Sequence, residues 1–403
     1  MNLRVQRNST NLDIPDRAIN SQERISPALE EKLSDGRIQF SGHIPKLDSL
    51  RGVAILLVVA YHAYGGDIDY RKWHGAAHYF LYLSRYGYTG VELFFVLSGF
   101  LITSILLKSK TGPAYYRSFY MRRALRILPA YFAILIVIKI WMGVSWKYIL
   151  ACLLYIANMA SLVGARTSEY APLWSLAVEE QFYLVWPFCV RKCRERTLLR
   201  LTIGLCIFLP IARLMTTIFF PHLDIRYKTY FIADYLAYGA LIAICLHLGY
   251  IHSCNIQRIA RWLIVVGAAL SLAVVCAGYA EHGFRYASPV LRSMGVLPFL
   301  WMYSGMVLKA IASSHFGNQR SNAVLSFLGY ISYGLYLIHG FLLYEYGKLS
   351  AYGYLSQLNR SFFILSIRFI SVAAASIVLA YLSRRFYEGY FLRLRFKTRH
   401  GGN

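Results

Sequence analysis

An arginine and a histidine frame the first long apolar stretch of the sequence, LRGVAILLVVAYH. Arg51 stands eleven positions before His62, which is about three turns and roughly 16 Å of an α-helix, so both side chains lie on one helix face. An imidazole with a pKa of about 6.5 can take a proton from a hydroxyl group. An ionisable side chain inside an apolar helix indicates function, although a hydrogen bond to a neighbouring helix would also explain His62.

Three other apolar stretches carry ionisable or hydroxyl side chains. GYTGVELFFVLSGFL contains Glu92 and Ser98, APLWSLAVEEQFYLVWP contains Glu179 and Glu180, and LSFLGYISYGLYLIHGFLLY contains His339. A carboxylate is costly in lipid, so we expect at least one of the paired glutamates to face an interior polar site. Pairing with a cation is the alternative for the glutamates. Helix packing is the alternative for Ser98, which two glycines flank.

Arginines cluster in the stretch FYMRRALRILPAYF, where Arg122, Arg123 and Arg126 precede Pro129, the expected start of a helix. Arg123 and Arg126 are three positions apart, so they share one helix face and can bind phosphate groups through paired hydrogen bonds. Anchoring at the cytoplasmic face of the membrane is the alternative, because basic residues collect there.

The composition is that of a polytopic membrane protein, since 57% of the 403 residues are hydrophobic and only 15% are charged. The net charge of +24 would suggest a nucleic-acid binder in a soluble chain. Here the basic residues lie between apolar runs, so we expect the lipid bilayer as partner and no nucleic acid. Seven cysteines without a CxxC pair predict neither a zinc site nor a disulfide framework.

Charge predicts the topology. The three densest basic clusters are residues 108–126, 191–200 and 383–399, and all three are expected in the cytoplasm. An even number of crossings must therefore separate Arg126 from Arg191. Three apolar segments lie between them, and residues 146–163, which end in the polar sequence NMASLVG, are predicted not to cross. The candidate segments are 47–65, 87–107, 127–142, 146–163, 173–190, 201–220, 230–248, 262–279, 290–308, 325–344 and 362–382.

The predicted fold is therefore an all-α integral membrane protein with about ten transmembrane helices and both termini in the cytoplasm. Residues 1–45 are polar and contain no apolar core of signal-peptide length, so we expect a cytoplasmic tail. Residues 46–390 form the membrane domain, and residues 391–403 form a basic cytoplasmic tail.

The topology predicts a segregation of side chains by depth. His62, Glu92, Glu179 and His339 are expected in the outer half of the membrane, and the arginines are expected at the inner face. This arrangement suits a reaction in which an anionic donor arrives from the cytoplasm and an acceptor waits outside.

Five stretches, in order and spacing, resemble the successive motifs of the acyltransferase-3 family of bacterial integral-membrane O-acyltransferases. They are LDSLRGVAILLVVAYH, GYTGVELFFVLSGFLI, FYMRRALRILPAYF, LWSLAVEEQFYLVWP and ISYGLYLIHG. The resemblance covers residues 46–390. It puts Arg51 and His62 on the family's arginine–histidine motif, Arg123 and Arg126 on its arginine-x-x-arginine motif, and Glu179 on the glutamate of its WSLxxE motif.

The resemblance implies transfer of an acyl group, most often acetyl, from acyl-CoA to a hydroxyl group, at the bacterial cytoplasmic membrane. The donor phosphates would bind Arg123 and Arg126, with help from Arg122 and Arg51. The acceptor would be a surface polysaccharide or lipid-linked sugar, or alternatively a small glycoside or antibiotic. Neither a bound cofactor nor a metal ion is required. Because no hydrolase-like extension is expected, the membrane domain or a separate partner would complete the transfer.

In this interpretation His62 is the general base, and Glu179, or else Glu92, orients its imidazole. Glu180 and His339 are supporting candidates. Ser98, like His62 itself, is a candidate for a transient acyl-enzyme.

A polytopic transporter is the alternative from another functional class, because it too would have about ten crossings and buried charges. The two halves of the sequence show no convincing repeat, and this absence disfavours the transporter.

Overall fold

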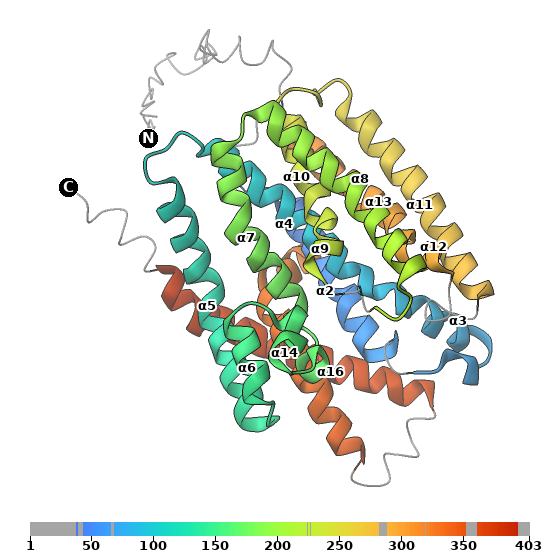
Figure 1. Ribbon diagram of the computed structural model, residues 1–403. Helices are drawn as coiled ribbons and strands as arrows, with labels where there is room; N and C mark the ends of the chain where they lie inside the picture. Colours follow the sequence, from blue (N-terminus) through green and yellow to red (C-terminus); the bar gives the residue numbers. More distant parts are fainter. Residues whose placement is uncertain are drawn as a thin grey trace, which may run out of the picture.

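The computed structural model describes residue 38 and residues 43–65, 68–223, 225, 227–281, 288–318, 320–351 and 361–393. All regular secondary structure within these ranges is helical, which confirms the predicted all-α class (Figure 1). The predicted tails, residues 1–45 and 391–403, lie mostly outside the described ranges.

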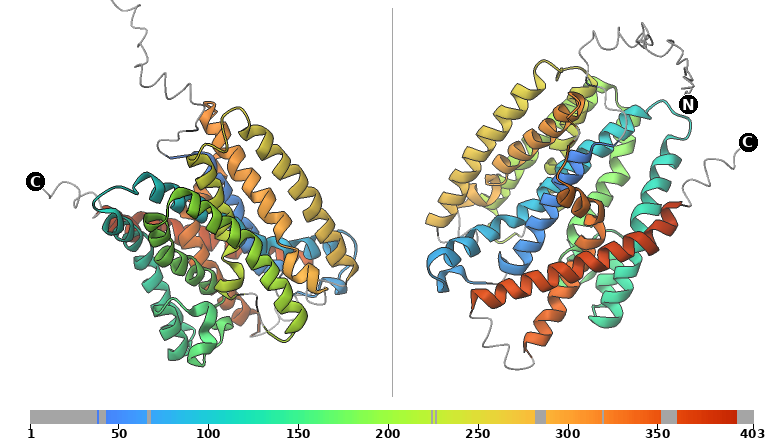
Figure 2. Two further views of the ribbon diagram at one scale, coloured as in Figure 1. Left: turned by 45° about the horizontal axis from the view of Figure 1, so that its top comes forward. Right: turned by 180° about the vertical axis from the view of Figure 1, so that it is seen from behind.

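Long helices follow the apolar runs of the sequence. They are α2 (Pro45–Ala60), α4 (Thr89–Lys108), α5 (Tyr115–Trp141), α7 (Leu173–Lys192), α8 (Glu195–Phe219), α10 (Asp234–His247), α11 (Ile256–Ala280), α13 (Leu297–His315), α14 (Ala323–Ala351) and α16 (Phe362–Leu382). Shorter helices connect them, namely α3 (Gly75–Ser84), α6 (Trp146–Leu153), α9 (Thr229–Ile232) and α12 (Pro289–Met294). Helix α16 runs obliquely along α14 (Figure 2).

Within the described residues, eight helices are long and apolar enough to cross a membrane, so the chain is a multi-pass membrane protein. Two helices expected to cross are not among the eight. Helix α7 has 20 residues but carries two glutamates, an arginine and a lysine. Helix α10 has 14 residues, about 21 Å, which is short of a hydrocarbon core of about 30 Å. Ten crossings and cytoplasmic termini therefore stay predictions.

Helix α4 is central, because it packs against α2, α7, α10 and α13. Glycines permit the closest contacts. A Cβ atom on Gly99 would lie 2.0 Å from the carbonyl oxygen of Leu236 on α10, and one on Gly90 would lie 2.4 Å from that of Ala54 on α2. The close approach of neighbouring helices, expected from these glycines, is therefore present on two faces of α4.

The expected helix start at Pro129 is wrong, because α5 begins at Tyr115 and carries Pro129 in its interior. A proline inside a helix leaves a carbonyl group of the preceding turn without its usual N–H partner. Tyrosine hydroxyls bind carbonyls nearby: Tyr333 donates to Ile127 at 3.0 Å, and Tyr387 donates to Pro129 at 3.2 Å. The basic first half of α5 is helical too.

Residues 146–163 do not form one long helix. Helix α6 has eight residues, about 12 Å, and a 3₁₀ segment, η4 (Ala157–Val163), follows it. Figure 1 places α6 at the same end of the bundle as α3. A helix this short cannot cross the bilayer alone, and this supports the prediction of a non-spanning segment.

Cysteine labelling tests this topology. Arg117, Ser168 and Arg196 are all exposed, so burial does not limit their reactivity. In a cysteine-free background, a cysteine at Ser168 should react with an impermeant thiol reagent in intact cells, and cysteines at Arg117 and Arg196 should be protected. All three should react after the cells are permeabilised. Protection at Ser168 in intact cells would mean that residues 146–163 cross the membrane.

Candidate active site

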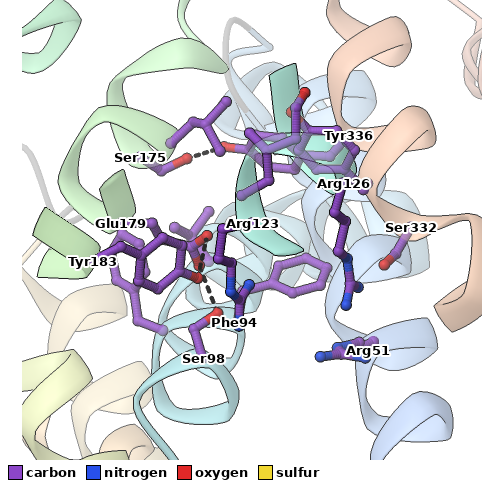
Figure 3. Close-up of a pocket in the computed structure, with 15 residues that line it drawn as sticks. Arg51, Phe94, Ser98, Arg123, Arg126, Ser175, Glu179, Tyr183, Ser332 and Tyr336 are labelled. Carbon is purple, nitrogen blue, oxygen red and sulfur yellow. Dashed lines mark hydrogen bonds between the residues drawn. The ribbon is translucent and has the colours of Figure 1, made fainter. Parts of the chain in front are cut away.

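A cavity with about 710 Å³ of empty space, its opening included, lies between α2, α4, α5, α7 and α14. Figure 3 shows polar side chains from each of these helices around one space. The lining residues are Arg51, Val91, Phe94, Phe95, Ser98, Arg123, Arg126, Ile127, Ser175, Leu176, Glu179, Tyr183, Ser332, Tyr333 and Tyr336.

Three arginines contribute to this lining, and they come from α2 and α5. Helix α5 begins at Tyr115, so Arg123 and Arg126 are about 12 and 16 Å along it. Arg51 lies six residues after Pro45, the first residue of α2. The three guanidinium groups therefore line one cavity between the helices, and their place at the inner face of the membrane stays a prediction.

The three arginines have different surroundings. Nη1 of Arg51 is 2.9 Å from Oδ1 of Asp48, three residues earlier on α2. The guanidinium of Arg123 lies 4.7 Å from the ring centre of Tyr183, a cation–π contact that restrains the group. Arg126 is exposed and lines the cavity. Arg122, which was also expected to bind the donor, is not among the lining residues.

Glu179 belongs to this arginine cavity. Ser98 Oγ donates a hydrogen bond to its Oε1 at 2.8 Å, and the Tyr183 hydroxyl donates to its Oε2 at 3.2 Å. Among the described residues, no hydrogen bond joins Glu179 to His62. The expected contact between the two is therefore absent, because counting residues gives depth along a helix but neither tilt nor rotation. Tyr183 was missed, although its position four residues after Glu179 puts both on one face of α7.

The other two glutamates lie outside the cavity lining. Glu92 is buried in α4 and is close enough to Arg213 and Asp234 for electrostatic interaction. Arg213 on α8 binds both carboxylate oxygens of Asp234 on α10, at 3.2 and 3.3 Å. Glu92 thus lies near α8 and α10. A carboxylate that orients His62 would have to lie beside His62 instead. Glu180 has a buried oxygen that accepts no hydrogen bond from the described residues.

His62 lies beyond the end of α2, in a π-helical turn, η1 (Tyr61–Gly65), a conformation that often occurs at functional sites. Its Nδ1 is 2.9 Å from the Val58 carbonyl oxygen and 3.3 Å from Nε2 of His339 on α14. The sequence places both histidines in the outer half of the membrane, and the structure brings their rings together.

One tyrosine connects this histidine pair to the cavity. Tyr336 lines the cavity, and its ring centre is 5.6 Å from that of His339. Its hydroxyl is 2.5 Å from that of Ser175, which fixes the ring (Figure 3). The pair therefore lies one aromatic ring away from the arginine cavity. Tyr336 was also missed, although it stands three residues before His339 on the same helix.

Relatives of this chain are named as acetyltransferases. The chain is 29% identical over 340 residues to YrhL of Bacillus subtilis (strain 168), which is named as a candidate peptidoglycan O-acetyltransferase. This match covers 75% of this chain and 49% of YrhL. It is 27% identical over 327 residues to the peptidoglycan O-acetyltransferase OatA of Listeria monocytogenes, covering 74% of this chain and 49% of that one. The chain thus spans about half the length of these relatives. No solved structure matches it.

The family assignment rests on a longer match. Residues 44–385 match the acyltransferase-3 family, described as an acyltransferase domain. This match covers nearly the whole membrane domain expected from the sequence, and it confirms the resemblance that the five motifs carry. The chain therefore belongs to the acyltransferase-3 family.

Proposed function

We propose that this protein is a membrane O-acyltransferase, which moves an acyl group, acetyl by analogy with the family, from cytoplasmic acyl-CoA to a hydroxyl of a surface polysaccharide. The convergence of Arg51, Arg123 and Arg126 on one cavity is the observation that carries the proposal. Acyl-CoA is polyanionic, and guanidinium groups bind phosphates through charge-assisted hydrogen bonds. Glu179 is the only acidic side chain in the described lining, so the cavity favours an anion.

The reaction would follow the path from this cavity to His62. With the phosphates held by the arginines, the long flexible arm of the donor would extend past Tyr336. His62 would take the proton of the acceptor hydroxyl as the oxygen attacks the thioester carbon. The carbon–sulfur bond then breaks, and the protonated imidazole returns its proton to the leaving thiolate, giving an ester and CoA.

The names of the relatives favour a cell-wall acceptor. Two of them are named for O-acetylation of peptidoglycan, a polysaccharide outside the bacterial cytoplasmic membrane. We therefore propose that membrane as the location of the chain, with the arginine cavity supplied from the cytoplasm. A small glycoside would be the acceptor in the alternative case.

Vesicles containing the full chain test the proposal with [1-¹⁴C]acetyl-CoA as donor and isolated peptidoglycan or surface polysaccharide as acceptor. Base-labile label on the glycan is the expected result, and it should be accompanied by one released CoA per acetyl group transferred. Accumulation of intact donor inside the vesicles without any transfer would contradict the proposal and favour a transporter.

Ser98 offers a second route, because its hydroxyl donates a hydrogen bond to Glu179 in the cavity. In this route Oγ attacks the thioester, and Glu179 takes the proton and passes it to the leaving thiolate. The acceptor hydroxyl then attacks the acyl-serine, the bond between the acyl carbon and Oγ breaks, and the acceptor's proton returns to Oγ through Glu179. Direct transfer predicts that Ser98→Ala keeps most of the activity. Loss of activity in Ser98→Ala, together with an acetylated Ser98 peptide in wild-type protein quenched without acceptor, would establish the acyl-serine route.

A further inference from the structure

Helices α2 and α14 share a spaced sequence pattern. Each contains a serine, a glycine three positions later and a histidine ten positions after the glycine. In α2 and its π-helical end these residues are Ser49, Gly52 and His62. In α14 they are Ser326, Gly329 and His339. Every member of the second set stands 277 positions after its counterpart. Ser49 contacts Ser326 and His62 contacts His339, so the pairs in contact have this same separation.

The shared pattern has a structural basis, because the two segments run side by side in the same direction. The hydroxyl oxygens of Ser49 and Ser326 are 2.8 Å apart. A Cβ atom on Gly329 would lie 1.9 Å from the Asp48 carbonyl oxygen, and one on Gly52 would lie 2.1 Å from that of Leu325. The backbones therefore touch at the glycines, and this contact fixes the register in which the histidines meet.

The hydrogen bonds define the tautomer of each imidazole. Nδ1 of His339 lies 3.2 Å from the Leu335 carbonyl oxygen, which can only accept, so Nδ1 carries the proton and Nε2 carries a lone pair. Nδ1 of His62 faces two acceptors, the Val58 carbonyl oxygen and Nε2 of His339. It must therefore be the protonated nitrogen of His62, and this leaves the lone pair on His62 Nε2.

Burial distinguishes the roles of the two rings. His339 is fully buried, with 0% of its surface exposed, whereas His62 is partly exposed. Only His62 can meet a substrate hydroxyl directly. When its Nε2 takes a proton, the imidazolium becomes a stronger donor through Nδ1, and a neutral His339 Nε2 lies 3.3 Å away to accept.

We propose that His339 is a positioning residue, which holds His62 in the tautomer with a basic Nε2 and stabilises the imidazolium through its own Nε2. This rests on the proposed function, in which His62 is the base. His339 thus takes the role expected of Glu179, and a neutral imidazole replaces the carboxylate of a hydrolytic triad.

Three variants of His339 separate this role from simple packing. The amide oxygen of glutamine can reach the position of Nε2, whereas asparagine can replace only the Nδ1 bond to Leu335. We expect His339→Ala and His339→Asn to lower the rate at saturating acetyl-CoA by roughly 10- to 100-fold, as for loss of a hydrogen bond to a charged group. His339→Gln should recover most of it. All three should bind CoA as the wild type does, because His339 does not line the arginine cavity.

Each outcome decides the proposal. A rate for His339→Asn equal to or above that of His339→Gln would show that only the Nδ1 bond matters, and it would overturn the proposal. Wild-type rates in all three variants, or equal losses in all three, would overturn it too. Activity in His62→Ala would instead refute the base assigned under the proposed function.

A measurement on the wild-type protein remains decisive even where a variant fails to fold. In ¹⁵N-histidine-labelled protein, with the His62 signals identified by their loss in His62→Ala, neutral His62 should show a protonated Nδ1 and an unprotonated Nε2. The opposite tautomer would overturn the proposal.

Discussion

His62→Ala is expected to lower acyl transfer by about 10²- to 10⁴-fold, the usual contribution of a general base. The bundle should remain folded, because His62 lies in η1, beyond the glycine contacts between α2 and α14, and is already partly exposed. Transfer from [1-¹⁴C]acetyl-CoA and binding of CoA should be measured on the same preparation. The expected result is a lost rate with unchanged CoA affinity, since His62 does not line the arginine cavity.

A matched control is available at the other end of the bundle. His247 is the last residue of α10, with 38% of its side chain exposed beside Glu195, and His247→Ala should retain the wild-type rate. If His62→Ala kept more than a tenth of the activity, His62 would lose its role as the base.

Arg123→Ala and Arg126→Ala should each weaken CoA binding by about 1.5–3 kcal/mol, the usual loss for a charge-assisted hydrogen bond. The apparent KM for acyl-CoA should rise by the corresponding factor. Lysine at either position should restore only part of the affinity, because an ammonium group cannot form the paired hydrogen bonds of a guanidinium. Calorimetric titration with CoA measures the effect directly.

Arg117 provides the control for this series, because it lies on the same helix and is exposed. Arg117→Ala should bind CoA as the wild type does. Equal CoA affinities in Arg117→Ala, Arg123→Ala and Arg126→Ala would contradict the prediction. The two cavity arginines would then serve as membrane anchors.

The sequence predicted helix positions well, since apolar runs mark them directly. It also placed Arg123 and Arg126 on one helix face, because a spacing of three residues determines that. It misjudged the start of that helix, because the helical first half of α5 is basic and only the apolar second half resembles a membrane span. Hydropathy contains no information on where a partly polar helix begins inside a bundle.

Partners across helices were harder to predict. Depth alone grouped His62 with Glu179, but a contact also depends on the tilt of each helix and on its rotation about its axis. The structure joins Glu179 to Ser98 and His62 to His339. The repeated spacing of serine, glycine and histidine in α2 and α14 was the one signal in the sequence for the second contact.

The glycine contacts between α2 and α14 also restrict how a bulky acceptor can enter. Backbone touches backbone there, so no side chain can rotate aside to part these two helices. The far end of η1 is different, because Tyr64 meets α16 through ring contacts with Phe362 and Phe369, at centroid distances of 6.4 and 5.1 Å. Ring contacts can slide and separate with little strain. If the proposed function holds, a sugar chain that approaches from the side should therefore part η1 from the first turns of α16, while α2 and α14 stay together.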